Sequence, residues 1–272
     1  DENKTKVDKL KKNEIEINEK NLKRNILKNK NKLNFTNKIS DVLKSDIIFL
    51  GLDIATNSFG KSDYSEINKY LNIFKKKLKP SQTLVILSQI QPGFSQKLKK
   101  KIKCNLVYFV ETLEFANAVE RAANPERLII GCDDKFDDKF KKFLTIFKCP
   151  ILKMNYQSAE LTKIAINLYL ISSVTTTNYI NTISKKIKAN WSDIKNALSL
   201  DKRIGKFAYL SPGLGISGGN LERDLNSIMQ ISKNLKLKDD LFRVWYQKSI
   251  ESKLWISDII KQNKSKLKIK NI

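Results

Sequence analysis

Two polar side chains that could act together in catalysis lie four residues apart, at Lys163 and Asn167. They interrupt an apolar stretch with helical spacing, and residues four apart share one face of a helix. An ammonium and an amide on one face could hold a negatively charged oxygen that develops during a reaction. The spacing alone favours the simpler interpretation of a surface lysine beside an asparagine.

A glycine-rich segment with the sequence PGLGISGG, at 212–219, leads into Asn220, Arg223 and Asp224, where a helix is expected to begin. Glycines before a helix expose backbone N–H groups that suit an anionic partner, and Asp224 could act as a base. A loop with an ordinary acidic first turn explains the same residues equally well. The stretch GLGISG formally matches the dinucleotide-binding pattern, but it lies in the helical half of the chain with no strand after it, so we expect a tight turn or a close approach to a ligand instead.

The composition removes several kinds of catalytic site. Histidine is absent, which excludes Ser–His and Cys–His nucleophile pairs and every imidazole base. The three cysteines form no C-x-x-C pair and no metal-ligand spacing, so no metal site is expected. Acid–base chemistry must therefore come from Asp, Glu, Lys, Tyr or water.

The elements that would carry these residues follow two patterns. Up to residue 155, short apolar runs alternate with amphipathic stretches such as Tyr64–Leu78, which is typical of an α/β domain. The predicted strands are Leu33–Thr36, Asp46–Leu52, Thr83–Ser88, Asn105–Val110, Arg127–Cys132 and Pro150–Asn155. From 156 to 262 the pattern is helical, with one helix of about 30 residues and no strand. Residues 263–272 are predicted to be a basic linker.

The net charge of +24 raises the possibility of a nucleic-acid partner. Only six of the 52 basic residues are arginine, and the lysines are spread along the whole chain. Groove-reading proteins favour arginine, so we expect a solvated basic surface and no nucleic-acid partner. No apolar run reaches the ~18 residues of a membrane span, and no signal peptide opens the chain, which favours a cytoplasmic protein without a membrane partner.

Several segments, in their order along the chain, resemble the UDP-glucose/GDP-mannose dehydrogenase family. They are DVLKSDIIFLGLDIAT, LVILSQIQPGF, ETLEFANAVERAANPERLIIG, AELTKIAINLYL, DKRIG and GLGISGGNLERDL. The resemblance covers nearly the whole chain. It implies an NAD-dependent enzyme that oxidises a hydroxyl of a nucleotide sugar for polysaccharide precursor synthesis. It also implies a partial Rossmann-type domain at 1–155, followed by a helical central domain with a long helix that forms a homodimer.

The resemblance assigns catalytic roles to four matching positions. Lys163 and Asn167 match the pair that stabilises the oxyanion derived from the sugar. Asp224 matches the carboxylate that helps a water or the lysine to take the hydroxyl proton. Glu111 matches the glutamate that activates the hydrolytic water, although a gap in the alignment would place Glu114 there.

Binding roles follow in the same way. Arg203 in DKRIG matches an arginine that reaches across the dimer to the substrate. The backbone at Gly215, Gly218 and Gly219 matches the sugar-site loop. Asp1 matches the acid that binds the cofactor ribose, which would place the family's G-x-G-x-x-G turn before residue 1 and its C-terminal domain after residue 272.

Three departures from the family pattern bear on the reaction. The catalytic cysteine falls on Asn220, the lysine before the aspartate on Arg223, and a threonine near the cofactor on Gln89. Arg223 and Gln89 are therefore expected at the cofactor. A carboxamide cannot form the thiohemiacetal through which the family completes its second oxidation. The chemistry is thus predicted to be altered, the alternative being a relative that binds nucleotide sugars without catalysis.

Overall fold

The structure, a computed structural model, describes residues 1–57, 62–114, 116–133, 135–216 and 219–263. The chain divides into two compact units. The first comprises Asp1–Ile54 and Tyr64–Lys163, and the second comprises Ala55–Asp63 and Ile164–Ile272.

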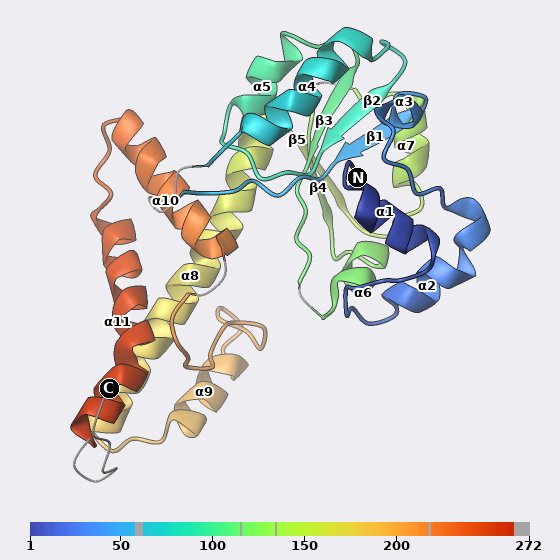
Figure 1. The fold of residues 1–272 in the computed structure, drawn as a ribbon. Helices are drawn as coiled ribbons and strands as arrows, with labels where there is room; N and C mark the ends of the chain where they lie inside the picture. Colours follow the sequence, from blue (N-terminus) through green and yellow to red (C-terminus); the bar gives the residue numbers. More distant parts are fainter. Residues whose placement is uncertain (58–61, 115, 134, 217–218, 264–272) are drawn as a thin grey trace. The chain divides into compact units, whose positions relative to one another are not determined.

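The first unit contains a five-stranded sheet in the order β1-β2-β3-β4-β5 (Figure 1). Its strands are Ile47–Leu50, Thr83–Ile86, Asn105–Phe109, Leu128–Gly131 and Ile151–Met154. Neighbouring strands are parallel except for the antiparallel pair β3 and β4. The sequence predicted all five strands, with ends that agree within about two residues.

The sixth predicted strand, Leu33–Thr36, is wrong. This segment follows the short 3-10 helix η1 (Lys30–Lys32), and in the described part of the chain it pairs with no strand. The Thr36 carbonyl accepts a hydrogen bond from the amino group of Asp1 at 3.3 Å instead. An apolar run becomes a strand only where another strand offers its backbone groups, and the run alone does not supply that partner.

Helices cover both faces of the sheet, which explains why β2 and β4 are buried along their whole length. α4 (Ser65–Lys77) and α5 (Phe94–Lys99) lie over one face and α7 (Asp138–Leu144) over the other (Figure 1). α4 buries Ile67, Leu71 and Phe74 on a helical period, as its sequence predicted. The unit also contains α1 (Lys4–Lys11), α2 (Leu22–Lys28), α3 (Ile39–Val42) and α6 (Ala118–Ala123).

The second unit is helical. It contains most of α8 (Tyr156–Lys186), together with α9 (Trp191–Leu200), α10 (Gly219–Asn234) and α11 (Asp240–Gln262). Ile171 of α8, Ile216 and Leu225 of α10 form its buried centre. Within the described residues of 160–262 there is no strand, so the predicted change from α/β to helical structure is confirmed. The predicted boundary at 155 coincides with the start of α8, whereas the compact units divide inside this helix.

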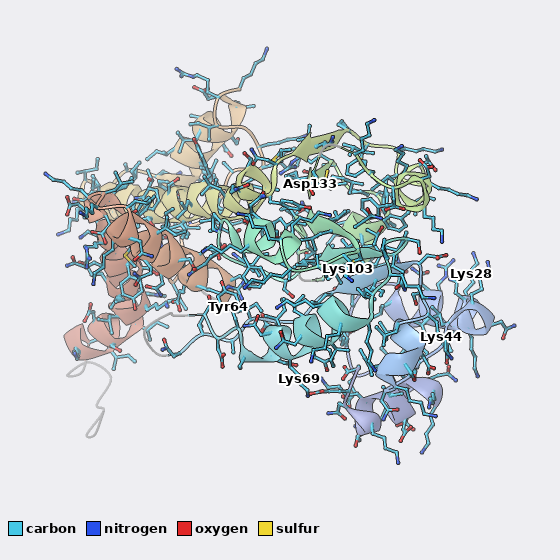
Figure 2. The ribbon with its side chains drawn as sticks, turned by 90° about the horizontal axis from the view of Figure 1, so that it is seen from above. Lys28, Lys44, Tyr64, Lys69, Lys103 and Asp133 are labelled. Atoms are coloured by element: carbon cyan, nitrogen blue, oxygen red, sulfur yellow. The ribbon has the colours of Figure 1, made fainter. Side chains whose placement is uncertain are left out.

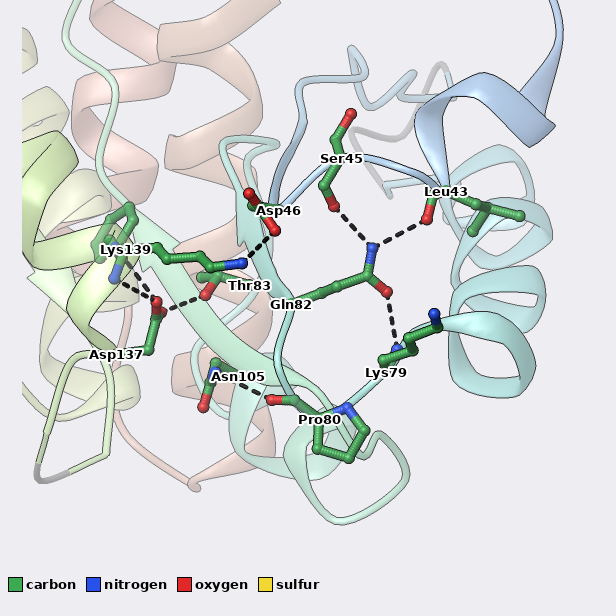
Figure 3. Close-up of polar contacts among 11 residues, drawn as sticks. Leu43, Ser45, Asp46, Lys79, Pro80, Gln82, Thr83, Asn105, Asp137 and Lys139 are labelled. Atoms are coloured by element: carbon green, nitrogen blue, oxygen red, sulfur yellow. Dashed lines mark hydrogen bonds and ion pairs between the residues drawn. The ribbon is translucent and has the colours of Figure 1, made fainter.

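The amino ends of the strands are tied together by the side chain of Gln82, which is 6% exposed (Figure 3). Its amide nitrogen donates to the carbonyl oxygens of Leu43 at 2.9 Å and Ser45 at 2.7 Å. Its amide oxygen accepts from the backbone N–H of Lys79 at 2.8 Å. One side chain therefore satisfies three backbone groups around the start of β1 and β2.

Replacing Gln82 with alanine is expected to destabilise the first unit by about 1–3 kcal/mol, because three partly buried backbone groups lose their partner. Native-state hydrogen exchange of the β2 amides measures this loss directly. Gln96→Ala, at a half-buried glutamine of α5, serves as the control and should change stability by no more than about 0.5 kcal/mol. Equal exchange rates in the two variants would contradict the role given to Gln82.

Exposed lysines occur on many elements of the first unit, as the sequence suggested. Figure 2 labels Lys28 at the end of α2, Lys44 before β1, Lys69 on α4 and Lys103 before β3, and all four are exposed. Among the residues described, no helix is both long and apolar enough to span a membrane.

Candidate active site

The start of α8 is held tightly against the sheet. The buried Tyr156 donates its hydroxyl hydrogen to the Leu106 carbonyl of β3 at 2.8 Å. Gly131 of β4 lies beneath the helix, where a Cβ atom would be only 2.8 Å from the Cβ of Ala159. Such a contact is too short for two carbon atoms, so a glycine is required for this close approach. Sequence analysis did not identify either anchor.

Lys163 lies on the second turn of α8, and its ammonium group donates to the carbonyl oxygen of Glu111 at 2.5 Å. Glu111 follows Val110 after the end of β3, and its carboxylate accepts the backbone N–H of Leu113. The alternative residue, Glu114, is exposed and pairs with Arg121 at 3.3 Å. The structure therefore places the backbone carbonyl of Glu111 at the Lys163 ammonium, and the choice between Glu111 and Glu114 stays a prediction.

Asn167, one turn further along α8, is joined to Asp224 of α10. The Asn167 amide donates to one carboxylate oxygen of Asp224 at 2.5 Å, and the Arg223 Nε lies 3.8 Å from the other. All three residues are buried: Asn167 is 8% exposed, Asp224 1% and Arg223 6%. Burying a carboxylate is costly unless a cation and a hydrogen-bond donor lie close to it, and both lie close to Asp224.

Arg223 also sets the orientation of Asn220. A terminal guanidinium nitrogen of Arg223 donates to the side-chain carbonyl oxygen of Asn220 at 2.8 Å. A guanidinium has only donors, so the oxygen of the amide must face it and the NH2 group must point away. Asn220 is exposed, and it therefore presents hydrogen-bond donors, without a nucleophile, at the beginning of α10.

The glycines of the loop differ in what they do. Gly215 has a φ of +86°, and a Cβ there would lie 2.8 Å from Ser249 of α11. The Ser249 hydroxyl also accepts the N–H of Ile216 at 3.0 Å. Packing against α11 thus explains Gly215 without a ligand, whereas Gly219 has open space around it. Gly218 lies outside the described residues, and the binding role of all three stays a prediction.

Arg203 lies in the exposed loop after α9. Its guanidinium pairs with Asp201 of the same loop at 2.6 Å and is 89% exposed. Exposed pairs of this kind contribute little stability, so Arg203 could exchange Asp201 for another anion. Its predicted role across a dimer is not tested by a single chain.

A cavity of about 750 Å³ runs along the outer edge of β1. Asp1 lines it together with Gly51 and Asp53, which follow β1 at its carboxyl end. Gln89 is half-buried just after β2. Asp1 and Gln89 belong to the first unit and Arg223 to the second, so their grouping at one cofactor site stays a prediction.

Acidic and thiol side chains do not gather into a possible metal-binding group anywhere in the described part of the chain.

The contacts described above group the predicted catalytic residues into two clusters, one in each unit. The first contains Lys163 and Glu111, and the second contains Asn167, Arg223, Asp224 and Asn220.

Comparison with known families finds matches over two consecutive parts of the chain. Residues 1–148 match the NAD binding domain of the UDP-glucose/GDP-mannose dehydrogenase family, and residues 157–248 match its central domain. The two matches together cover more than half of the chain.

Individual relatives carry related names. UDP-glucose 6-dehydrogenase TuaD of Bacillus subtilis is 28% identical over 213 residues, which are 75% of this chain and 46% of that protein. UDP-glucose 6-dehydrogenase of Rattus norvegicus is 23% identical over 237 residues, or 78% of this chain and 47% of that protein. The chain spans about half the length of these two relatives.

Solved structures share the fold. A UDP-glucose dehydrogenase from Pyrobaculum islandicum superimposes with a TM-score of 0.82 at 20% identity, covering 97% of this chain and 63% of that one. A UDP-D-ManNAc dehydrogenase from Pyrococcus horikoshii superimposes with a TM-score of 0.85 at 16% identity, covering 98% of this chain and 66% of that one. The chain therefore shares with these solved structures the fold of a partial Rossmann-type unit followed by a helical unit with a long helix.

Proposed function

Because the chain belongs to the UDP-glucose/GDP-mannose dehydrogenase family, we propose that the full-length protein oxidises a hydroxyl of a UDP- or GDP-sugar with NAD. The observation that carries this proposal is the pairing of the predicted catalytic residues. Lys163 contacts Glu111, and Asn167 contacts Asp224, although 52 and 57 residues separate the members of these pairs. A role in polysaccharide precursor synthesis follows from the same family membership.

The first unit offers residues that fit NAD. Its cavity of about 750 Å³ lies within the range of about 300–1,000 Å³ that is usual for small-molecule sites. Asp1 supplies a carboxylate beside the carboxyl end of a parallel strand, where dinucleotide-binding domains bind ribose hydroxyls. We infer that Asp1 and Gln89 would line the cofactor site, with Arg223 as the further contact implied by the family pattern. NAD, when bound, accepts the hydride from the sugar carbon.

The chain's own residues would manage charge and protons. The Lys163 ammonium is held at the end of β3, where it can stabilise a negatively charged oxygen of the substrate. Asp224 is buried as an ion pair and can take the hydroxyl proton, directly or through a water. Asn167 fixes the Asp224 carboxylate and can donate its second N–H to the substrate oxygen. Glu111 would activate the water that hydrates an aldehyde intermediate if the reaction proceeds to an acid.

The proposed reaction differs from that of the family because Asn220 stands where the family has its catalytic cysteine. A carboxamide has no lone pair of comparable nucleophilicity to a thiolate, so no covalent adduct with an aldehyde forms there. The first oxidation needs only the cofactor, a base and support for an oxyanion, and these are retained. The protein then stops at the aldehyde, oxidises a hydrated aldehyde without covalent capture, or acts on another hydroxyl.

The experiment is to incubate the full-length protein with NAD and a panel of UDP- and GDP-sugars, and to follow NADH by absorbance. NADH formation with at least one nucleotide sugar supports the proposal. The alternative function, a non-catalytic relative, predicts calorimetric binding of a nucleotide sugar without any NADH. If no nucleotide sugar of the panel is bound or turned over, both candidate functions are contradicted.

We also propose that the protein is a homodimer built on α8. This helix exposes apolar side chains that a monomer would leave in water, namely Tyr169, Tyr179, Ile180 and Ile183. Sedimentation of the full-length protein at micromolar concentration should give a dimer, and replacing Ile180 and Ile183 with glutamate should give a monomer. A monomeric parent protein would contradict the proposal.

A further inference from the structure

Glu160 is the one acidic residue in α8, and its side chain is completely buried. One carboxylate oxygen accepts the backbone N–H of Gly93 at 2.5 Å, and the other accepts the N–H of Ser95 at 2.8 Å. Both donors belong to the first turn of α5 and the residue before it. A single carboxylate thus connects the loop after β2 to the start of α8.

This contact is specific for a carboxylate. Each oxygen accepts from a different backbone N–H, so a glutamine would turn its NH2 group toward one of them, whichever way its amide is placed. Burial raises the pKa of the Glu160 carboxyl, whereas the backbone N–H groups of Gly93, Phe94 and Ser95 act in the opposite direction. Desolvation of a charged group is costly, so these bonds must be geometrically good for the contact to persist.

Lys163 is three residues further along the same helix, so it lies on nearly the same side, about 4.5 Å along the axis. The helix is rigid at this length, and whatever fixes the rotation of α8 at Glu160 also fixes the position of the Lys163 side chain. Tyr156 and Gly131 hold the helix against β3 and β4, whereas Glu160 holds it to α5.

We propose that Glu160 is a positioning residue, which connects α5 to α8 and thereby holds the Lys163 ammonium at the Glu111 carbonyl. This inference rests on the proposed function, since Lys163 is the group that would stabilise the substrate oxygen. Glu160 itself touches no substrate. It lies within the first unit together with all the residues through which it acts.

The test compares the full-length parent protein with Glu160→Gln in two measurements. The first is the rate at which acetic anhydride labels Lys163, mapped by mass spectrometry, which does not depend on activity. We expect Lys163 to react several-fold faster in the variant. The second is steady-state kinetics, in which kcat should fall by about ten- to a hundredfold with KM nearly unchanged, because a displacement of about 1 Å can cost that much in rate.

Glu126→Gln, at an exposed glutamate, is the matched control and should leave both measurements unchanged. If Glu160→Gln does not fold, Glu160→Asp takes its place, because it keeps both oxygens but is one methylene shorter. A folded variant with parental labelling and parental kcat would overturn the proposal. If the parent forms no NADH with any sugar, the proposed function fails, and the labelling rate still decides the role of Glu160.

Discussion

Replacing Lys163 with methionine is expected to lower kcat of the full-length protein by about 10²–10³-fold, with a much smaller change in KM. Methionine keeps most of the length and the apolar stem of lysine but lacks the charge. The ammonium group is held at the Glu111 carbonyl, so its loss removes the cation that would stabilise the substrate oxygen. Binding of the nucleotide part of the substrate would be unaffected.

Two further variants make this expectation specific. Lys186→Met removes an exposed lysine from the other end of α8 and should leave kcat unchanged. Lys163→Arg keeps the charge but not the compact geometry, and it should recover only a small part of the activity. A Lys163→Met protein that retains kcat within about twofold would rule out the role of the ammonium.

Replacing Asp224 with alanine is expected to destabilise the second unit by about 3–5 kcal/mol, since it removes the carboxylate that lies 3.8 Å from the buried Arg223 guanidinium. The Asn167 amide loses its acceptor in the same variant. All three tryptophans, Trp191, Trp245 and Trp255, lie in the second unit. Their fluorescence during urea unfolding therefore measures the stability of that unit.

The mechanism of this loss can be tested with a double variant. Replacing Arg223 with methionine and Asp224 with leucine removes both charges, and it should be clearly more stable than Asp224→Ala alone. Asp258→Ala, at an exposed aspartate of α11, should change stability by no more than about 0.5 kcal/mol. If the Asp224→Ala protein is as stable as the Asp258→Ala protein, the pair of Arg223 and Asp224 does not stabilise the second unit.

The sequence predicted those features that depend on local periodicity. Continuous apolar runs identified the five strands of the sheet, and helical spacing identified α4 and α8 with their approximate ends. Ordered motifs identified the family, and through it the candidate residues that form the two polar clusters. These predictions succeeded because each is encoded within a short stretch of the chain.

Contacts between distant residues could not be predicted in the same way. Glu160 and Ser95 are 65 residues apart, and nothing in either segment indicates that a buried carboxylate will meet the first turn of α5. Gly131 has no unusual φ, and its importance follows only from the closeness of Ala159. The available signal for Glu160 was that it is the one acidic residue in a helix whose first half is largely apolar. The prediction of a strand at Leu33–Thr36 was wrong for a related reason, because a strand forms only where another strand can pair with it.

The most direct test of the central claim is the number of NADH molecules formed per nucleotide sugar consumed, for the full-length parent and for Asn220→Cys. Asn220 is exposed at the beginning of α10, so a cysteine there should cost little stability and would add a nucleophile that can trap an aldehyde. The parent is expected to form about one NADH per sugar, or to react very slowly, because no covalent capture occurs. Asn220→Cys should move toward the two NADH per sugar of a complete oxidation to the acid. A parent protein that rapidly forms two NADH and a carboxylate would contradict the claim that Asn220 alters the reaction.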